Sequence, residues 1–274
     1  MRTSRSARRG DASVGAIVFA SLLALVPGCA RAPRGVPSFD AISVRHAEGR
    51  ARREAVLGAM RADVVLRLDG RATGRLPAFA ASVAIAAPDR VRLQAHALLG
   101  VVLDAAVRED SVLVRLPGER AAFLLGGAGE SLGVTRPAAF VARVLAATWR
   151  PPAGAWGAAR ADSAGCTVAW RDGADSLELS VDASGRPHTL RFERGVHVVH
   201  VHYEEWQSVR GREFPTALSV RDDEGWVRAR VRVEDLRFSA RADEDWFEWR
   251  IPSTTRVLTW SDIRDLIRQE VQQP

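Results

Sequence analysis

The chain has 274 residues, of which 47% are apolar and 26% are charged, a balance typical of a globular protein with a substantial core. All 39 basic residues are arginines, against 33 acidic residues, which gives a formal net charge of +6. The arginines alternate with Asp and Glu and form no basic stripe with interleaved aromatic residues, so the composition argues against a nucleic-acid-binding protein.

The N-terminus has the composition of a secretory signal. Four arginines among the first nine residues precede the apolar run Val14–Val26. A membrane-spanning helix needs about 20 residues, and this run has only 13. Its length matches the apolar region of a signal peptide, which has about 7–15 residues. We therefore expect residues 1–28 to be a signal peptide.

The next feature is a cysteine motif. The four residues Val26–Cys29 resemble the lipobox of bacterial lipoproteins. The resemblance implies that Cys29 is acylated and becomes the first residue of the mature protein, with residues 29–37 as a tether. Ala30 stands where an Asp often signals retention in the inner membrane, which favours the outer membrane. Two alternatives stay open: an ordinary signal peptide, and a disulfide bond between Cys29 and Cys166.

The first element of the mature domain is expected to be a helix at Asp40–Met60. This stretch has no internal Pro, and its apolar residues recur at helical spacing. The residues that can share one apolar side are Ile42, Val44, Ala55, Val56 and Ala59.

From Arg61 onward apolar residues occupy alternate positions, which predicts β-strands. The pairs Pro88-Asp89 and Pro117-Gly118 mark turns between them. The segments with this period are Val64–Leu68, Phe79–Ala87, Val91–Ala95, Val101–Val107, Val112–Leu116 and Arg120–Leu125.

A second helix is expected at Pro137–Thr148, where apolar residues recur three and four apart and Pro151-Pro152 ends the pattern. A third is expected at Ser261–Val271. Between them, strands are expected at Cys166–Arg171, Leu177–Val181, Leu190–Phe192, His197–Trp206, Ala217–Arg221 and Val227–Val233.

This order of elements predicts one domain over residues 38–274. The expected fold class is mainly β (α+β), with a single curved antiparallel sheet of about ten or eleven strands whose concave face is covered by helices. In the strand Val227–Val233, arginines alternate with apolar residues, so one face of the sheet is expected to be solvated and the other buried.

Two stretches resemble the LolA/LolB-like periplasmic lipoprotein-binding domains. In Phe79–Leu116 an alternating strand runs into the turn Pro88-Asp89-Arg90, and Leu98-Leu99-Gly100 makes a short loop before the next strand. The second stretch is Phe247–Pro252. The likeness extends over most of the mature chain.

The resemblance implies a half-open β-barrel with helices over it and an apolar cavity for acyl chains. It also implies that the domain transports lipoproteins or lipids, or receives them at the outer membrane. Lipid-anchored relatives use an exposed apolar residue in a loop between two early strands, and Leu98 and Leu99 occupy the matching loop. The alternative is that Leu98 and Leu99 continue the core of the hairpin.

Residues that often form catalytic or metal sites do not assemble into one in this sequence. His200 and His202 share a face of a strand, with Glu204 beyond them, but a zinc site usually needs further ligands and only His188 is a candidate. Ser163 lacks a Gly-x-Ser-x-Gly frame. We therefore predict no catalytic residue, no metal and no cofactor.

Two further features are ambiguous. The acidic triplet Asp243–Asp245 has too few ligands for a calcium loop, which favours a solvated turn. The tryptophans of the C-terminal half either line a ligand cavity or fill the core; they are Trp206, Trp226, Trp246, Trp249 and Trp260.

Together these features predict a lipoprotein that is not an enzyme and is anchored by lipid to the periplasmic face of the outer membrane. Its expected partners are acyl chains or lipoprotein cargo, bound in an apolar cavity, and the small residues of Phe79–Ala87 favour such a cavity. The alternatives are a structural or assembly lipoprotein that docks to other envelope proteins without a ligand, and a hydrolase on the same scaffold.

Overall fold

A computed structural model of the chain describes residues 38–258 except 71–73, 76, 98–99, 109–110, 126–136, 162–164, 226–227, 240 and 249–250, and leaves undescribed the side chains of 74, 75, 119 and 125. The chain divides into the units Met1–Val36 and Pro37–Pro274, and every described residue belongs to the second. Cys29, Leu98, Leu99 and the expected C-terminal helix lie outside the described residues.

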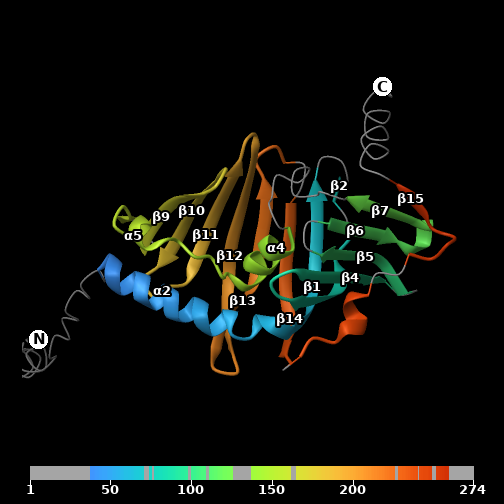
Figure 1. The fold of residues 1–274 in the computed structure, drawn as a ribbon, viewed down its shortest axis with the longest axis horizontal. Coiled ribbons are helices and arrows are strands. Elements are labelled where there is room, and N and C mark those ends of the chain that lie inside the picture. Colours follow the sequence, from blue (N-terminus) through green and yellow to red (C-terminus); the bar gives the residue numbers. More distant parts are fainter. Residues whose placement is uncertain are drawn as a thin grey trace, which may run out of the picture. The chain divides into compact units, whose positions relative to one another are not determined.

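The described residues form one 15-stranded sheet (Figure 1). Fourteen strands follow the order β15-β7-β6-β5-β4-β3-β1-β14-β13-β12-β11-β10-β9-β8, and β2 pairs with β1. The strands are β1 (Met60–Gly70), β2 (Gly74–Arg75), β3 (Phe79–Ala86), β4 (Arg90–Ala97), β5 (Gly100–Arg108), β6 (Ser111–Leu116), β7 (Ala121–Leu125), β8 (Arg160–Ala161), β9 (Gly165–Asp172), β10 (Asp175–Asp182), β11 (Pro187–Arg194), β12 (His197–Val209), β13 (Arg212–Asp222), β14 (Arg228–Phe238) and β15 (Arg256–Leu258).

The expected mainly β fold, a curved sheet with helices over it, is confirmed, but the strand count and the strand directions differ from the prediction. The sheet is not closed into a barrel. The additional strands β2, β8 and β15 have only two or three residues, which is too short for an alternating pattern to be visible in the sequence. One pair, β15 with β7, is parallel, because a connection over the sheet returns the chain to its far edge.

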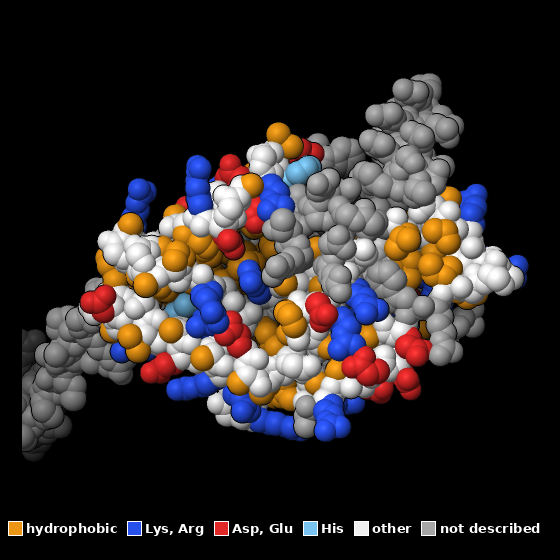
Figure 2. Space-filling view, viewed as in Figure 1, with side chains coloured by type: hydrophobic (Ala, Val, Ile, Leu, Met, Phe, Trp, Pro, Cys, Tyr) orange, Lys and Arg blue, Asp and Glu red, His pale blue; other side chains and the backbone are white. Residues whose placement is uncertain are grey.

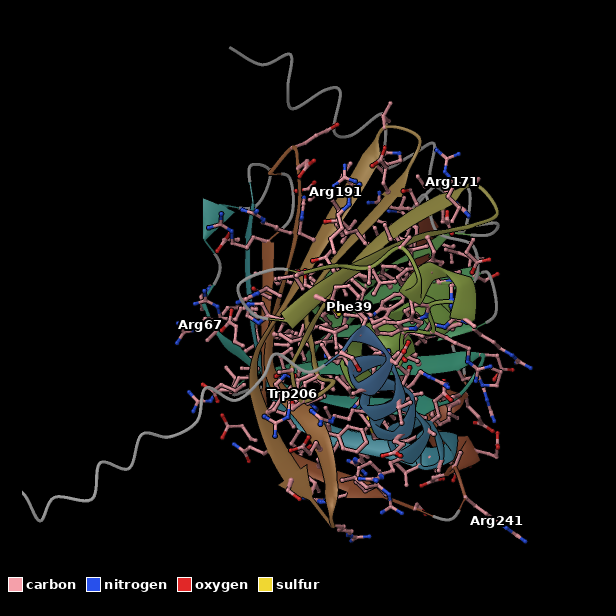
Figure 3. All side chains as sticks on the ribbon, turned by 90° about the vertical axis from the view of Figure 1, so that its left-hand side faces the viewer. Phe39, Arg67, Arg171, Arg191, Trp206 and Arg241 are labelled. Atoms are coloured by element: carbon pink, nitrogen blue, oxygen red, sulfur yellow. The ribbon has the colours of Figure 1, made fainter. Side chains whose placement is uncertain are left out.

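The two faces of the sheet differ in character. We call the face that packs against α2 (Phe39–Glu54) and α4 (Pro137–Ala146) the inner face and the opposite one the outer face. Figure 3 shows Phe39 of α2 within the curve of the sheet, while Arg67 lies on its outer side. Cross-strand neighbours buried on the inner face include Leu66, Val231, Leu218 and Tyr203.

Helix α2 is shorter and more polar inside than predicted. Ser38 caps its N-terminus by accepting a hydrogen bond from the Ala41 backbone N–H. The helix ends at Glu54 and not at Met60, where β1 begins after the short 3₁₀ helix η1 (Leu57–Ala59). The expected apolar side was right for Ile42, which is buried, and wrong for Val44, which is 55% exposed. The other buried residues of α2 are His46 and Arg53.

Helix α4 agrees with the sequence at its start and ends two residues early. Pro137 stands in its first turn, a position where a missing N–H has no cost. The helix crosses the inner faces of β4, β5 and β13 and buries Ala138, Ala142 and Val144 there. The short α5 (Ala153–Trp156) follows. Within the described residues, no helix is long and apolar enough to cross a membrane.

After β14 the chain crosses the outer face to the far edge of the sheet, and we call residues 239–258 the strap. It contains η3 (Glu244–Phe247), which lies beside β4 (Figure 1). The Arg61 guanidinium stacks 3.8 Å from the Trp246 ring centroid, Arg92 Nη1 donates to the Trp246 carbonyl at 2.7 Å, and Arg90 pairs with Glu244. The acidic triplet is exposed, as a solvated turn would be, and Glu244 in addition forms an ion pair with Arg90.

Under this half of the outer face lies a buried ion cluster on three adjacent strands. Asp104 of β5 is 6% exposed and accepts hydrogen bonds from Arg92 (2.9 Å) and Arg115 (2.7 Å). Burial raises the pKa of Asp104, but the hydrogen bonds and charges of both arginines outweigh it and hold this pKa below its usual value. The cluster therefore couples β4, β5 and β6.

We expect Asp104→Asn to lower the free energy of unfolding at pH 7 by about 3 kcal/mol, because two half-buried guanidinium groups lose their counter-charge. The pKa of Asp104 is lower in the folded than in the unfolded chain. Its contribution is therefore complete above about pH 4 and is lost as the pH falls through the folded-state pKa. Urea unfolding at a series of pH values from neutral to acid should show the unfolding free energies of the wild type and Asp104→Asn converging.

The matched control is Asp172→Asn on the exposed end of β9, which should change stability by less than about 0.5 kcal/mol. A difference between wild type and Asp104→Asn that stayed constant down to strongly acid pH would contradict this account of the cluster.

Candidate functional site

An apolar pocket lies between the sheet and α4. Every residue that lines it is apolar, and its volume is only about 20 Å³, close to that of a single water-sized sphere. An apolar pocket therefore lies between the sheet and a helix, where the acyl-chain cavity was expected, but side chains nearly fill it. The lining residues are Met60, Ala62, Val64, Val83, Leu145, Phe214, Pro215, Leu218, Val233 and Leu236.

Beside this pocket, the inner face of β4–β7 is apolar and only half-buried. Register places the side chains in rows across the strands, for example Leu93 with Ala105, Val114 and Phe123. Figure 2 shows hydrophobic side chains gathered over β5–β7 on the helix-bearing face. We call these residues the inner apolar surface: Leu93, Leu103, Ala105, Val107, Val114, Leu116 and Phe123.

The segment that follows α4 is fastened to both α2 and the sheet. Ala147 has a left-handed backbone (φ 51°), which directs its carbonyl to Arg53 Nη2 at 3.0 Å. Trp149 Nε1 donates to the Tyr203 hydroxyl at 2.9 Å, and this hydroxyl donates to the Val144 carbonyl at 3.1 Å. His46 Nε2 lies 3.0 Å from the Trp149 carbonyl. We call His46, Arg53, Trp149 and Tyr203 the helix clasp.

Burial sets the protonation of the clasp. Burial lowers the pKa of Arg53 to about 10, so the guanidinium stays charged at neutral pH. The guanidinium carbon lies 5.1 Å from the centroid of the Trp206 ring, over which it stacks. Burial also lowers the pKa of His46 and raises that of Tyr203. A neutral His46 donates to one carbonyl only, although its nitrogens face both Trp149 and Gly185.

Gly185 explains how α2 approaches the sheet so closely. It lies in the turn between β10 and β11 with φ +88°, and a Cβ there would stand 2.6 Å from the His46 backbone nitrogen. Arg45 Nη1 donates to the carbonyl of Ala183 in the same turn at 2.7 Å. The backbone of α2 therefore rests directly on this turn.

The structure tests some of the site residues predicted from the sequence and leaves others untested. Cys29, Leu98 and Leu99 stay predictions, although the strands that flank the Leu98-Leu99 loop, β4 and β5, pair as expected. His200 and His202 do share the outer face, where they pair across β12 and β13 with Arg221 and Ser219.

Both histidines contact other side chains of the protein. His200 Nε2 lies 2.6 Å from Asp223 Oδ1, and the His202 ring packs 4.6 Å from that of His188. In the part of the chain that the structure describes, no group of three or more His, Cys, Asp or Glu residues is arranged to hold a metal. The sequence analysis did not identify the clasp. The one local signal it could have used is Gly185, which has no side chain to keep α2 away from the turn.

Comparison with known proteins identifies the architecture. No protein-family model and no curated protein matches the sequence. Among solved structures, a LolA superfamily protein of Nitrosomonas europaea aligns with a TM-score of 0.50 at 12% identity, covering 74% of this chain and 97% of the other. The chain has a LolA-like fold. The fold implied by the sequence resemblance is thus confirmed.

Two further structures align over similar lengths with lower scores. A putative outer membrane lipoprotein-sorting protein domain of Vibrio parahaemolyticus has a TM-score of 0.46 at 10% identity, covering 75% of this chain and 95% of the other. The lipoprotein LppX of Mycobacterium tuberculosis has a TM-score of 0.32 at 12% identity, covering 74% and 99%.

The contact between α2 and the β10–β11 turn leads to a testable prediction. Gly185→Ala should lower the free energy of unfolding by roughly 1–2 kcal/mol for the left-handed backbone and by roughly 1–3 kcal/mol more for the collision with α2. Trypsin should also cut at the arginines of α2 faster than in the wild type, because the helix is pushed off the turn.

Gly195→Ala is the matched control, since Gly195 has φ +58° in the next hairpin and a Cβ there would meet no atom within 4 Å. This control should lose only the stability that the left-handed backbone costs, and trypsin should cut α2 as slowly as in the wild type. Equal effects of the two substitutions would show that α2 does not depend on this contact.

Proposed function

We propose that the LolA-like domain binds acyl chains on its inner apolar surface and serves as a lipid-anchored acceptor or carrier of lipids or lipoproteins in the cell envelope. The observation that supports this most directly is the half-buried apolar face of β4–β7, which continues from the pocket under α4. Monomeric soluble proteins rarely leave a contiguous apolar surface open without a partner for it.

The pocket under α4 is too small to hold an acyl chain while α4 stays in place. We therefore place the chain along β5–β7, beside α4, where Val114 and Phe123 are half-buried. Each methylene group removed from water there contributes about 0.8 kcal/mol. Entry deeper under the helix would require Leu145 of α4 to leave the pocket.

The second part of the proposal concerns how the N-terminus anchors the domain to a membrane. Lipid on Cys29 would hold the domain at a membrane, and Ala30 favours the outer membrane. The Leu98-Leu99 loop would lie at the end of the β4–β5 hairpin and present cargo to the membrane. A structural or assembly role without any ligand is the alternative, and acyl-chain binding separates the two.

For the acyl-chain site, we expect a fluorescent fatty acid to bind the secreted Cys29→Ala protein and to be displaced by unlabelled lipid. Val114→Asp should weaken this binding about tenfold or more, because a carboxylate would be buried against the acyl chain without a partner. Fluorescence titration measures both proteins under the same conditions.

Leu124→Asp is the matched control, because Leu124 is 39% exposed and register places it on the outer face of the adjacent strand. It should bind the fatty acid as the wild type does. Leu98→Ser with Leu99→Ser should keep this affinity and slow delivery of lipid to vesicles. Failure of the wild type to bind any acyl probe would favour the structural role.

For the anchor, we expect Cys29→Ala to abolish incorporation of labelled palmitate and to move the protein from the membrane fraction to the soluble periplasmic fraction. One acyl chain anchors only marginally while several anchor stably, so loss of the whole modification should release the protein. Palmitate labelling that persisted in Cys29→Ala would contradict the assignment.

A further inference from the structure

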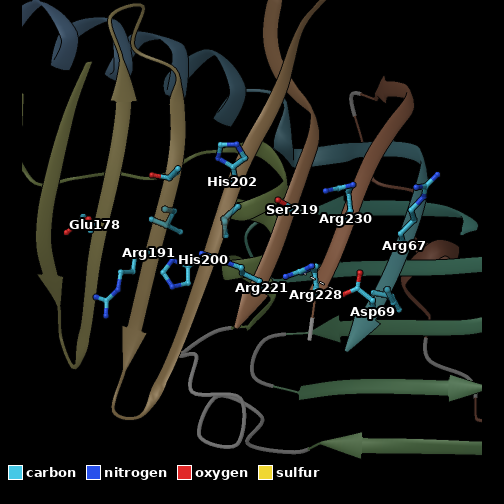
Figure 4. A pocket seen from close by; sticks show the side chains of 14 residues that line it. Arg67, Asp69, Glu178, Arg191, His200, His202, Ser219, Arg221, Arg228 and Arg230 are labelled. Atoms are coloured by element: carbon cyan, nitrogen blue, oxygen red, sulfur yellow. Dashed lines mark ion pairs between the residues drawn. The ribbon is translucent and has the colours of Figure 1, made fainter. Parts of the chain in front are cut away.

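The outer face of β10–β14 and β1 forms a hollow of about 940 Å³, on the opposite side of the sheet from the apolar pocket. Figure 4 shows its side chains in two rows across the strands. The first row is Thr189, His202, Ser219, Arg230 and Arg67, and the second is Glu178, Arg191, His200, Arg221, Arg228 and Asp69. We call this the basic hollow.

The charges of the hollow are not balanced. Its lining contains five arginines and only two carboxylates, an excess of three positive charges. Register places Arg221 directly opposite Arg228 and Arg67 directly opposite Arg230. Like charges directly opposite each other on neighbouring strands destabilise a sheet. The fold therefore tolerates repulsion at this place.

Elsewhere on the same face, other side chains compensate the charges of two arginines that lie opposite each other. At the other end of β1 and β14, Arg61 also lies opposite Arg237, but Arg61 stacks on Trp246 and Arg237 lies 2.5 Å from Asp235. In the hollow the ion pairs of the two β14 arginines are looser. Arg228 is 3.8 Å from Asp69 and Arg230 is 3.7 Å from Glu204.

Of the other arginines in the lining, Arg191 pairs with Glu193 at 2.5 Å. Among the described residues, neither Arg67 nor Arg221 has a carboxylate within ion-pair distance, and nor does Arg232, two residues after Arg230 on β14 and just outside the lining. The side chains of Arg228 and Arg230 are 62% and 59% exposed. Their guanidinium donors are thus available to a ligand.

The strap shows which kind of ligand this face accepts. It is a chain segment whose Glu244 pairs with Arg90 and whose Trp246 carbonyl accepts a hydrogen bond from Arg92. Arginines on the outer face of the sheet thus already hold an acidic peptide segment within the same molecule. The basic hollow has the same type of side chains and no such segment among the described residues.

The spacing of the arginines favours an extended chain. Arg228, Arg230 and Arg232 occupy alternate positions of β14, so they repeat about every 6.7 Å. An extended peptide repeats its own alternate side chains at the same interval. We infer that the basic hollow binds an extended acidic segment of a partner protein, whose carboxylates at alternate positions pair with the arginines of β14 and its neighbours.

This inference is independent of acyl-chain binding, because the hollow and the inner apolar surface lie on opposite faces. A flat lipid bilayer would not enter the hollow, and one phosphate group would contact only part of the two rows, which cross five and six strands. Anionic vesicles and inorganic phosphate are therefore the competing ligands that the experiment includes.

The experiment uses the full chain in a non-ionic detergent and two capped fluorescent peptides of equal charge. One alternates its residues, Glu-Thr-Glu-Thr-Glu-Thr-Glu, and the other groups them, Glu-Glu-Glu-Glu-Thr-Thr-Thr. We expect the alternating peptide to bind about tenfold more tightly, and to weaken as salt rises to about 0.5 M, because the contacts are charge pairs.

Two double variants remove equal charge. Arg228→Gln with Arg230→Gln should weaken binding of the alternating peptide about tenfold or more, while Arg171→Gln with Arg241→Gln, at exposed positions outside the hollow (Figure 3), should change it less than about twofold. The urea midpoint of the first variant should not fall, because repulsion is removed. This separates lost binding from lost folding.

Three results would overturn the inference. The first is equal affinity for the alternating and grouped peptides. The second is an equal loss of peptide binding in both double variants. The third is that inorganic phosphate or phosphatidylglycerol vesicles bind in an Arg228- and Arg230-dependent manner while the alternating peptide does not bind.

Discussion

The attachment of α2 and α4 to the sheet depends on the helix clasp. Helix α2 buries only one large apolar residue, Ile42, so apolar burial alone gives it little reason to stay on the sheet. Instead Arg53 and His46 reach the carbonyls of Ala147 and Trp149, just after α4. Buried polar groups of this kind are costly unless partnered, so the two helices and β12 must assemble together.

The clasp decides how much of the inner face is covered. It fixes α4 over β4, β5 and β13, where Leu145 closes the apolar pocket. Beyond α4, the inner apolar surface stays half-buried. A sheet of this width is larger than two helices can cover, since a helix with its side chains is about 10–12 Å across and each strand adds about 4.8 Å. The uncovered remainder is the part available to an apolar ligand.

The outer face shows the same division between covered and open halves. The strap and the Arg92–Asp104–Arg115 cluster occupy the outer face near β4 and β5, while the basic hollow stays open on β10–β14 and β1. The sheet thus presents apolar chemistry on one side and cationic chemistry on the other. Two ligands of opposite character would not compete for the same strands.

The sequence alone was sufficient for most of the strands and for the start of α4, because alternation and Pro137 are local signals that tertiary packing did not override. It also predicted which face of β14 is wet, since Arg228 and Arg230 alternate with apolar residues there. It was insufficient for the end of α2, where buried His46 and Arg53 follow no apolar period.

Tertiary structure alone decided the clasp, the strap and the basic hollow. Arg67, Arg191 and Arg221 are far apart in the chain, and only the register of five strands places them in two neighbouring rows. Likewise, nothing near Arg53 in the sequence indicates that its partner is the carbonyl of Ala147. The physical reason is that periodicity records which side of a strand or helix is apolar, whereas register and helix docking depend on contacts between residues remote in sequence.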